Sequence, residues 1–133
     1  MRAALIQLTV TDDPAANLAA TQGFVAQAAQ GGAGFVLTPE MTNCLSSSRD
    51  HQRAIFRREE GDETLAGLRR AAKEHGIWLL VGSLGLLTQD GDGRFANRSF
   101  LIGPDGGIAA RYDKIHMFDV NVSEAEVYRE SSA

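Results

Sequence analysis

Ala3-Ala-Leu-Ile-Gln-Leu-Thr-Val10 and Phe35-Val-Leu-Thr-Pro-Glu40 are the two stretches that decide the fold of this chain. The first is almost continuously apolar, which is typical of a buried strand, and the second is a short apolar run that ends at Thr-Pro-Glu. Between them, apolar residues recur at helical spacing from Pro14 to Gln30, and Gly31-Gly32 follows as a helix stop. The pattern predicts strand–helix–strand, and such a crossover makes the two strands parallel.

The rest of the chain predicts two more helices and three more strands. The polar stretch 41–61 is expected to be loop with a short helix, and the tail from Asp113 shows no clear period. The expected helices cover Asp50–Phe56 and about Asp62–His75, and the expected strands cover Ile77–Leu87, Phe95–Ile102 and Ile108–Tyr112, with turns at 90–93 and 104–107. The predicted architecture is therefore α/β: a β-α-β unit, a helix, and then a β-meander in one mixed sheet.

Composition narrows the class of protein. The 133 residues, 44% of them apolar and 23% charged, suit one globular domain or a piece of one. A net charge of −4 without a basic run argues against nucleic acid and anionic membrane as partners. No stretch is apolar for long enough to span a membrane, and no secretory signal is visible. A single cysteine excludes an internal disulfide framework, so a cytoplasmic location is expected.

Three charged residues are candidates for chemistry. Glu40 directly follows a strand, where ligands bind in open α/β sheets, although a solvated loop carboxylate explains it equally well. Lys114 follows the last predicted strand and is suited to stabilise developing negative charge, although it also fits a surface lysine. Glu130 alone fits a surface carboxylate paired with Arg129, and the acidic run 59–63 fits a solvated face.

Other site types find little support in the sequence. Cys44, four residues after Glu40, is a candidate nucleophile, but an inert loop or semi-buried thiol is the simpler interpretation. The three histidines share no metal-ligand spacing, and neither a GxGxxG nor a P-loop motif occurs. No metal and no organic cofactor are therefore predicted.

Four stretches of the sequence, in their order along the chain, are informative when taken together. They are the opening strand with Asn17, Gly34–Glu40, Ile77–Ser83 with Asn97-Arg-Ser99, and Pro104–Asp119 with its Tyr-x-Lys-Ile-His-x-Phe-Asp block. Together they cover essentially the whole chain and resemble the N-terminal portion of the nitrilase superfamily, the carbon–nitrogen hydrolases. Within it they look like the amidases that hydrolyse small ω-amides and deaminated glutathione.

The resemblance implies a fold, an activity and site residues. The fold is an α-β-β-α sandwich, of which this chain carries only the N-terminal part. The activity is hydrolysis of a carbon–nitrogen bond in a small amide through a cysteine thioester. Glu40 matches the general base, Lys114 the residue that stabilises the tetrahedral anion, and Glu130 the second glutamate that assists proton transfer.

The nucleophile does not match. The family's cysteine lies further downstream at the end of a later strand, and Cys44 does not correspond to it. Residues 1–133 are therefore expected to be a carbon–nitrogen hydrolase domain truncated before that cysteine, and inactive alone. The uncovered sheet should pair with a second copy, as a homo-oligomer, or with a complementary C-terminal piece. The alternative is a non-enzymatic interaction module that retains the fold.

Overall fold

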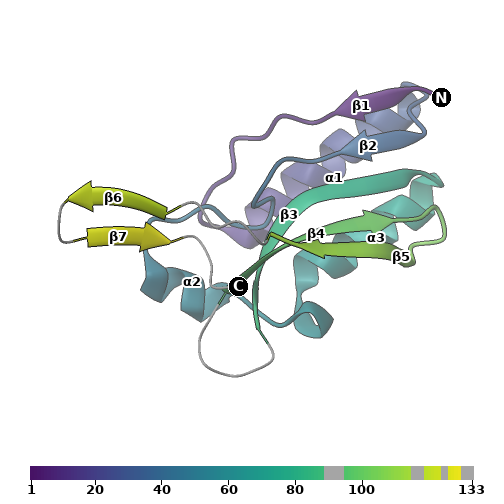
Figure 1. Ribbon diagram of the computed structural model, residues 1–133. Helices are drawn as coiled ribbons and strands as arrows, with labels where there is room; N and C mark the ends of the chain where they lie inside the picture. Colours follow the sequence, from purple (N-terminus) through teal and green to yellow (C-terminus); the bar gives the residue numbers. More distant parts are fainter. Residues whose placement is uncertain (89–94, 115–118, 124–125, 130–133) are drawn as a thin grey trace.

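The computed structural model describes residues 1–88 and 95–114 in full, together with the backbone of 119–123 and 126–129. Figure 1 shows the elements in chain order. They are β1 (Ala3–Leu5), α1 (Pro14–Gln30), β2 (Phe35–Leu37), α2 (Arg49–Ile55), the 3-10 turn η1 (Glu59–Gly61), α3 (Glu63–His75), β3 (Trp78–Leu87), β4 (Phe95–Ile102), β5 (Ile108–Asp113), β6 (Asp119–Ser123) and β7 (Glu126–Arg129).

The two long helices begin and end where the sequence places them. The Asp13 side chain accepts hydrogen bonds from the first backbone amides of α1, and Pro14 opens that helix. The Asp62 side chain accepts a hydrogen bond from Leu65 N at the start of α3. Gly76 ends α3 at φ 63°, in the left-handed region that glycine adopts without strain.

The described strands form a five-stranded mixed sheet and a separate hairpin. The order is β1-β2-β3-β4-β5, with β1, β2 and β3 parallel and β3, β4 and β5 antiparallel. The parallel pair of β1 and β2 and the antiparallel meander confirm the predicted α/β architecture. Helices α1 and α3 both lie behind this sheet in Figure 1.

One face of the sheet is covered by these helices. Register places five apolar residues side by side across the strands, and all of them belong to or pack against the main core cluster. This covered row consists of Ala4, Val36, Leu79, Ile102 and Ile108. Leu65, Leu68 and Ala72 of α3 and Val25 of α1 bury themselves in the same cluster. The chain's main hydrophobic core therefore lies between the sheet and α1 and α3.

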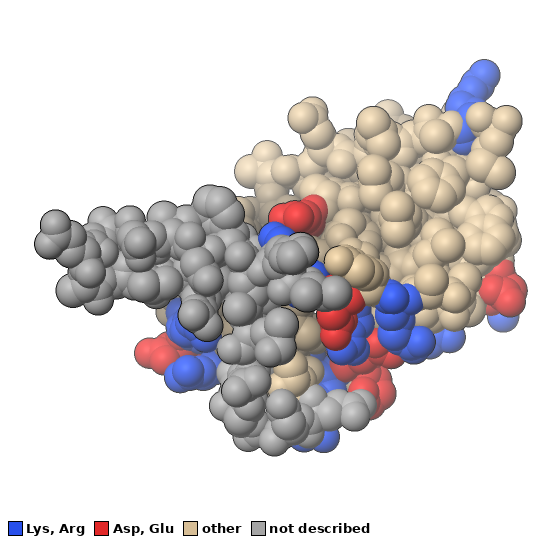
Figure 2. Space-filling view, in the orientation of Figure 1, with Lys and Arg blue, Asp and Glu red and all other residues tan. Residues whose placement is uncertain are grey.

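The opposite face is also apolar, and no helix among the described residues covers it. Leu5 of this face is 77% exposed, and Trp78 and Tyr112 are exposed as well. The second row across the strands, here named the open row, consists of Leu5, Leu37, Leu80, Leu101 and Ala110. Figure 2 looks onto this face and shows a broad area over β1–β5 without Lys, Arg, Asp or Glu. The helices α1 and α3 thus leave an apolar face of the sheet exposed.

Two sequence predictions are corrected. The strand expected over 3–10 ends at Leu5, and it is an edge strand rather than a buried one. Among the described strands it pairs with β2 alone, which stops at Leu37 just before Pro39, and proline has no N–H to continue a ladder. In the tail, β6 and β7 form an antiparallel hairpin that was not predicted. The turn at 90–93 lies outside the described residues.

No helix in the described part of the chain is long and apolar enough to cross a membrane.

Candidate active site

The loop that carries Glu40 is held against β3 by backbone contacts. Thr38 N donates to Leu80 O at 3.0 Å, and Gly82 N donates back to Thr38 O at 3.1 Å. A Cβ at Gly82 would lie 2.4 Å from Thr38 O, so only glycine admits the loop this close. Pairing of β3 with β4 shifts register between Val81 and Leu84, beside this contact. Glu40 is thereby positioned at the carboxyl end of β2.

The residue after Glu40 adopts an unusual backbone conformation. Met41 has φ 51°, in the left-handed region that non-glycine residues rarely adopt. Ser83 holds it there, because its Oγ accepts from Met41 N at 2.8 Å and its carbonyl accepts from Thr42 N at 3.0 Å. Strain of this kind persists where surrounding contacts determine the conformation, and it gathers at functional sites.

An asparagine side chain extends the sheet beyond the end of β2. Asn43 Nδ2 donates to Gly85 O at 2.8 Å, and Gly85 N donates to Asn43 Oδ1 at 2.9 Å. Asn17 Nδ2 in turn donates to Asn43 O at 2.9 Å. The buried amides of Asn17 and Asn43 therefore tie α1, the loop after Glu40 and β3 together.

The structure brings Glu40 and Lys114 together. Lys114 N donates to Asn97 O at 2.9 Å, which fixes its backbone beside β4. Its Nζ lies 3.9 Å from Glu40 Oε1, with the lysine side chain 31% exposed and the glutamate side chain 66% exposed. A carboxylate and an ammonium thus converge at the sheet edge. Their catalytic roles stay predictions, and Glu130 lies outside the described residues.

A cluster of ion pairs borders Lys114. Glu59 accepts hydrogen bonds from Arg111 and Arg98, and Arg98 also pairs with Asp113, the residue before Lys114. The hydrogen bond from Arg111, followed by that from Arg98, lowers the pKa of Glu59, against the opposing effect of its own desolvation. The interpretation of 59–63 as a solvated face is therefore wrong for Glu59. Its partners Arg98 and Arg111 are far away in the sequence, so no local pattern could predict these ion pairs.

The same interpretation is wrong for Asp62. Its side chain is buried, and burial raises its pKa despite the hydrogen bond from Leu65 N. The cap at the start of α3 is thus a buried carboxylate rather than a solvated one.

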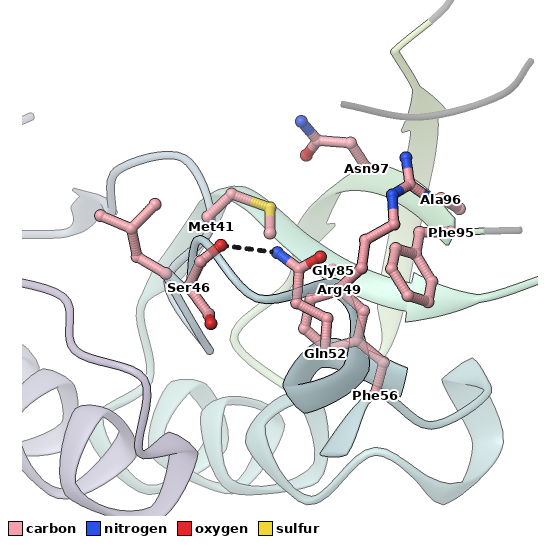
Figure 3. A pocket seen from close by; sticks show the side chains of 10 residues that line it. Met41, Ser46, Arg49, Gln52, Phe56, Gly85, Phe95, Ala96 and Asn97 are labelled. Carbon is pink, nitrogen blue, oxygen red and sulfur yellow. Dashed lines mark hydrogen bonds between the residues drawn. The ribbon is translucent and has the colours of Figure 1, made fainter. Parts of the chain in front are cut away.

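A cavity of about 110 Å³ lies between the loop after Glu40 and strand β4 (Figure 3). Neither member of the Glu40–Lys114 pair is among its described lining residues, but Met41 follows Glu40, and Asn97 holds the Lys114 backbone. Gly85 allows the Phe56 ring to pack against β3 in the cavity wall, since a Cβ at Gly85 would lie 2.3 Å from Phe56 Cζ. The cavity is lined by Met41, Leu45, Ser46, Arg49, Gln52, Phe56, Gly85, Phe95, Ala96 and Asn97. Sequence analysis did not predict it, because it depends on the pairing of β3 with β4.

Cys44 does not face this site as a reactive thiol. It is fully buried, and its Sγ contacts Asp12 O at 3.8 Å. Burial raises the pKa of the Cys44 thiol, and the charge of Asp12 raises it further. Both effects disfavour the thiolate, which is the nucleophilic form. This agrees with the interpretation of Cys44 as an inert thiol.

Within the described ranges, no group of three His, Cys, Asp or Glu side chains is arranged to hold a metal ion.

Known proteins resemble this chain over nearly its whole length. It is 30% identical over 129 residues to the deaminated glutathione amidase of Yersinia enterocolitica, covering 96% of this chain and 44% of that protein. It is 32% identical over 130 residues to human omega-amidase NIT2, covering 98% of this chain and 45% of that protein. The chain thus spans just under half the length of these curated relatives.

A solved structure supports the fold. An amidase from Nesterenkonia sp. superposes with a TM-score of 0.74 at 29% identity, covering 89% of this chain and 44% of that one. One solved variant of that amidase is described as showing Michael addition of acrylamide at the active site cysteine. The nitrilase-like fold class predicted from the sequence is confirmed.

The family model for carbon-nitrogen hydrolases matches residues 2–132. The match spans both the loop of Glu40 and the strand end of Lys114, so it covers the site as well as the sheet. This chain belongs to the carbon–nitrogen hydrolase family.

Proposed function

We propose that the protein of which this chain is a part hydrolyses a carbon–nitrogen bond of a small amide. The observation that carries the proposal is the convergence of Glu40 and Lys114, 3.9 Å apart, at the strand ends of a carbon–nitrogen hydrolase domain. Two curated relatives named as amidases support the same reaction class.

The two charged groups suit the steps of a covalent mechanism. Glu40 accepts the proton of a cysteine thiol, whose sulfur attacks the amide carbonyl carbon and forms a C–S bond. Lys114 stabilises the oxyanion of the tetrahedral intermediate. The C–N bond then breaks, and the nitrogen leaves as ammonia with the proton that Glu40 returns. Water, deprotonated by Glu40, attacks the thioester and releases a carboxylic acid and the thiol.

The second glutamate and the nucleophile of the site are proposed on separate grounds. Glu130 is proposed to assist the proton transfers, on the resemblance alone. The nucleophile is proposed to be a cysteine outside these residues, because Cys44 is buried with a raised pKa. The active site cysteine of the Nesterenkonia amidase supports a thiol nucleophile for the family. Residues 1–133 alone are therefore proposed to be inactive, as a domain lacking its nucleophile.

The open row is proposed to be covered by association. An exposed face with large apolar side chains such as Leu5 and Trp78 loses free energy that burial would recover. The isolated chain is proposed to pair with a second copy, sheet against sheet. No nucleic acid or membrane partner is proposed, on the charge pattern described above.

The test is ammonia release from a panel of small amides, by this chain and by the natural polypeptide that contains it. We expect the chain alone to be inactive and the natural polypeptide to be active. Glu40→Gln and Lys114→Met should each lower the rate of the active form by at least roughly a hundredfold, as expected for losing a general base or an anion-stabilising group. The exposed residues Glu60 and Lys73 provide matched controls as Glu60→Gln and Lys73→Met.

Two outcomes would contradict the proposal. Ammonia release by the chain alone that Cys44→Ser abolishes would make Cys44 the nucleophile after all. A natural polypeptide that releases no ammonia from any amide would instead favour the non-enzymatic interaction module.

A further inference from the structure

The turn that carries Glu40 is held by one residue of the neighbouring strand β3. Ser83 is hydrogen-bonded to residues on both sides of Glu40. Its N–H donates to Pro39 O at 3.3 Å, its Oγ accepts from Met41 N at 2.8 Å, and its carbonyl accepts from Thr42 N at 3.0 Å. Glu40 therefore lies at the tip of a turn whose two arms are bonded to the same residue.

The groups that hold the turn are buried, whereas Glu40 is not. Ser83, Thr38 and Thr42 are all buried, and the Thr42 hydroxyl donates to Pro39 O at 2.7 Å. Hydrogen bonds between buried groups are costly to break, because the separated partners find no water. The Glu40 side chain is 66% exposed, so packing does little to place it. Its position follows from the conformation of the turn.

The Ser83 hydroxyl acts on a strained residue. Met41 has φ 51°, a left-handed conformation that is costly for a residue with a Cβ and persists where contacts impose it. The bonds from the Ser83 N–H and carbonyl are backbone bonds, which almost any residue at this position can make. The bond to Met41 N needs a short side chain with an acceptor oxygen, and serine supplies one.

We propose that Ser83 is a positioning residue: its Oγ holds Met41 in the strained conformation, and the strained turn places the Glu40 carboxylate beside the Lys114 ammonium. Relaxation of Met41 to a negative φ would rotate the peptide between Glu40 and Met41. The Glu40 carboxylate would then move away from Lys114 Nζ, which lies 3.9 Å from it. The inference rests on the proposed function in treating this pair as catalytic, but the placement of the pair is measurable without any reaction.

Zero-length cross-linking with a carbodiimide measures the placement of the pair in the full chain. The reagent activates the Glu40 carboxylate, and attack by the Lys114 amine forms an amide while the two side chains are in contact. The sequence contains two lysines, Lys73 and Lys114, so peptide mass spectrometry assigns the link. We expect Ser83→Ala to lower the initial rate of this link by about tenfold, the size of one buried hydrogen bond that offsets strain.

Two further variants make the test specific. Ser99→Ala is the matched control, because Ser99 Oγ donates to Gly82 O at 2.7 Å, a side-chain bond to β3 rather than to the turn. It should leave the cross-linking rate unchanged. Ser83→Ala combined with Met41→Gly should regain most of the rate, because glycine adopts the left-handed conformation without strain. Thermal unfolding of each variant establishes that the fold is retained.

Two other measurements extend the test. Hydrogen exchange needs no variant: the Met41 amide donates to a buried oxygen, so it should exchange at least about tenfold more slowly than an unstructured amide. In the natural polypeptide, Ser83→Ala should lower kcat for a small amide by about tenfold and leave KM unchanged, because it misplaces the base rather than a contact to the substrate. Ser99→Ala should change neither constant.

Several outcomes would overturn the inference. They are equal cross-linking rates of Ser83→Ala and Ser99→Ala, no rescue by Met41→Gly, no Glu40–Lys114 link in the unaltered chain, or a Met41 amide that exchanges freely. If the natural polypeptide releases ammonia but Ser83→Ala leaves the link unchanged, the proposed function stands and the inference fails. If the link responds as expected but no amide is hydrolysed, Ser83 still positions the pair and the proposed function fails.

Discussion

The covered row and the open row both consist entirely of aliphatic residues but differ in environment. On β1 to β4 their members are adjacent along the strand, so neighbouring residues such as Leu79 and Leu80 point to opposite faces of the sheet. Leu79 is fully buried beneath the helices, whereas Leu5 of the open row is 77% exposed. The difference teaches that these strands carry the pattern of a sheet buried on both faces, while helices α1 and α3 cover one.

The largest expected effect is a stability difference between the two rows. Leu79→Ala should lower the free energy of unfolding by about 2–5 kcal/mol, because it leaves a cavity in the core. Leu5→Ala should change it by no more than about 0.5 kcal/mol, because that side chain is already in water. Denaturant unfolding at low protein concentration measures both. Similar losses would show that the open row is covered within the chain.

Association provides the next test of the open row. The double variant Leu5→Ser, Trp78→Ser should weaken self-association by more than tenfold, since burial of each large apolar side chain contributes about 1.5–3 kcal/mol. Sedimentation velocity over a hundredfold dilution measures the shift towards monomer. Phe24→Ser is the control, because Phe24 is an exposed apolar residue on α1. A compact monomer for the unaltered chain at every concentration would contradict the proposed pairing.

A smaller effect on stability is expected when glycine is replaced by alanine at two positions, one in the contact that holds the loop of Glu40 and one in helix α1. Gly82→Ala should cost about 1–3 kcal/mol and displace the loop of Glu40, because the new methyl group meets the backbone of Thr38 and Pro39. Gly23→Ala should instead stabilise by about 0.5–1 kcal/mol, because Gly23 lies inside α1 with nothing within 4 Å of its Cβ position. Chemical denaturation compares the two variants. Equal and neutral effects would mean that the loop is not held against β3.

The smallest expected effect concerns pH. The pKa of Glu59 is lowered in the folded state, so its pairs stabilise the fold above its ordinary pKa and are lost as the pH falls through the lowered value. Glu59→Gln should therefore flatten the loss of stability in acid and cost about 1 kcal/mol or less at neutral pH. Unfolding measured from pH 7 to pH 3 tests this, with Glu60→Gln as the control. If the unfolding free energy of Glu59→Gln fell with pH as steeply as that of the unaltered chain, the ion pairs of Glu59 would not stabilise the fold.

Asp62 contributes with the opposite sign. Its pKa is raised in the folded state by burial, so protonation favours the fold as the pH falls through the raised value towards the ordinary one. The variant Asp62→Asn keeps a capping side chain and should remove this gain. Asp62→Asn and Glu59→Gln should therefore change the pH dependence of the unfolding free energy in opposite directions.

The sequence pattern correctly predicted the elements whose bounds depend on residues nearby in the chain. Phe35–Leu37 and Phe95–Ile102 begin and end where the sequence placed them, because turn residues bound each of them along the chain. The prediction that the first strand reaches Val10 was wrong because its length depends on β2, the one described strand that pairs with it. The tail hairpin was missed although Asp119–Ser123 alternates polar and apolar residues, because its two strands are only five and four residues long and no glycine or proline stands between them to indicate a turn.

The site was predictable only in part. Glu40 and Lys114 each follow a strand, so their positions could be predicted, and the structure brings them together. Arg49 and Asn97 carry no local signal, since Asn97 reaches the cavity only through its pairing opposite Gly85. The positive φ of Met41 likewise depends on Ser83, a residue of another strand.

The hydrogen bonds between the Asn43 side chain and Gly85 have a consequence for aggregation. Strand β3 continues past the end of β2, which would leave a bare edge able to recruit a strand from another molecule. The Asn43 amide occupies both the N–H and the carbonyl of Gly85, as a neighbouring strand would. Asn43→Ala would leave the N–H and the carbonyl of Gly85 open between backbone contacts that cover Ser83 and Leu87 on the same edge, so this side chain closes the gap at which a strand of another molecule can pair.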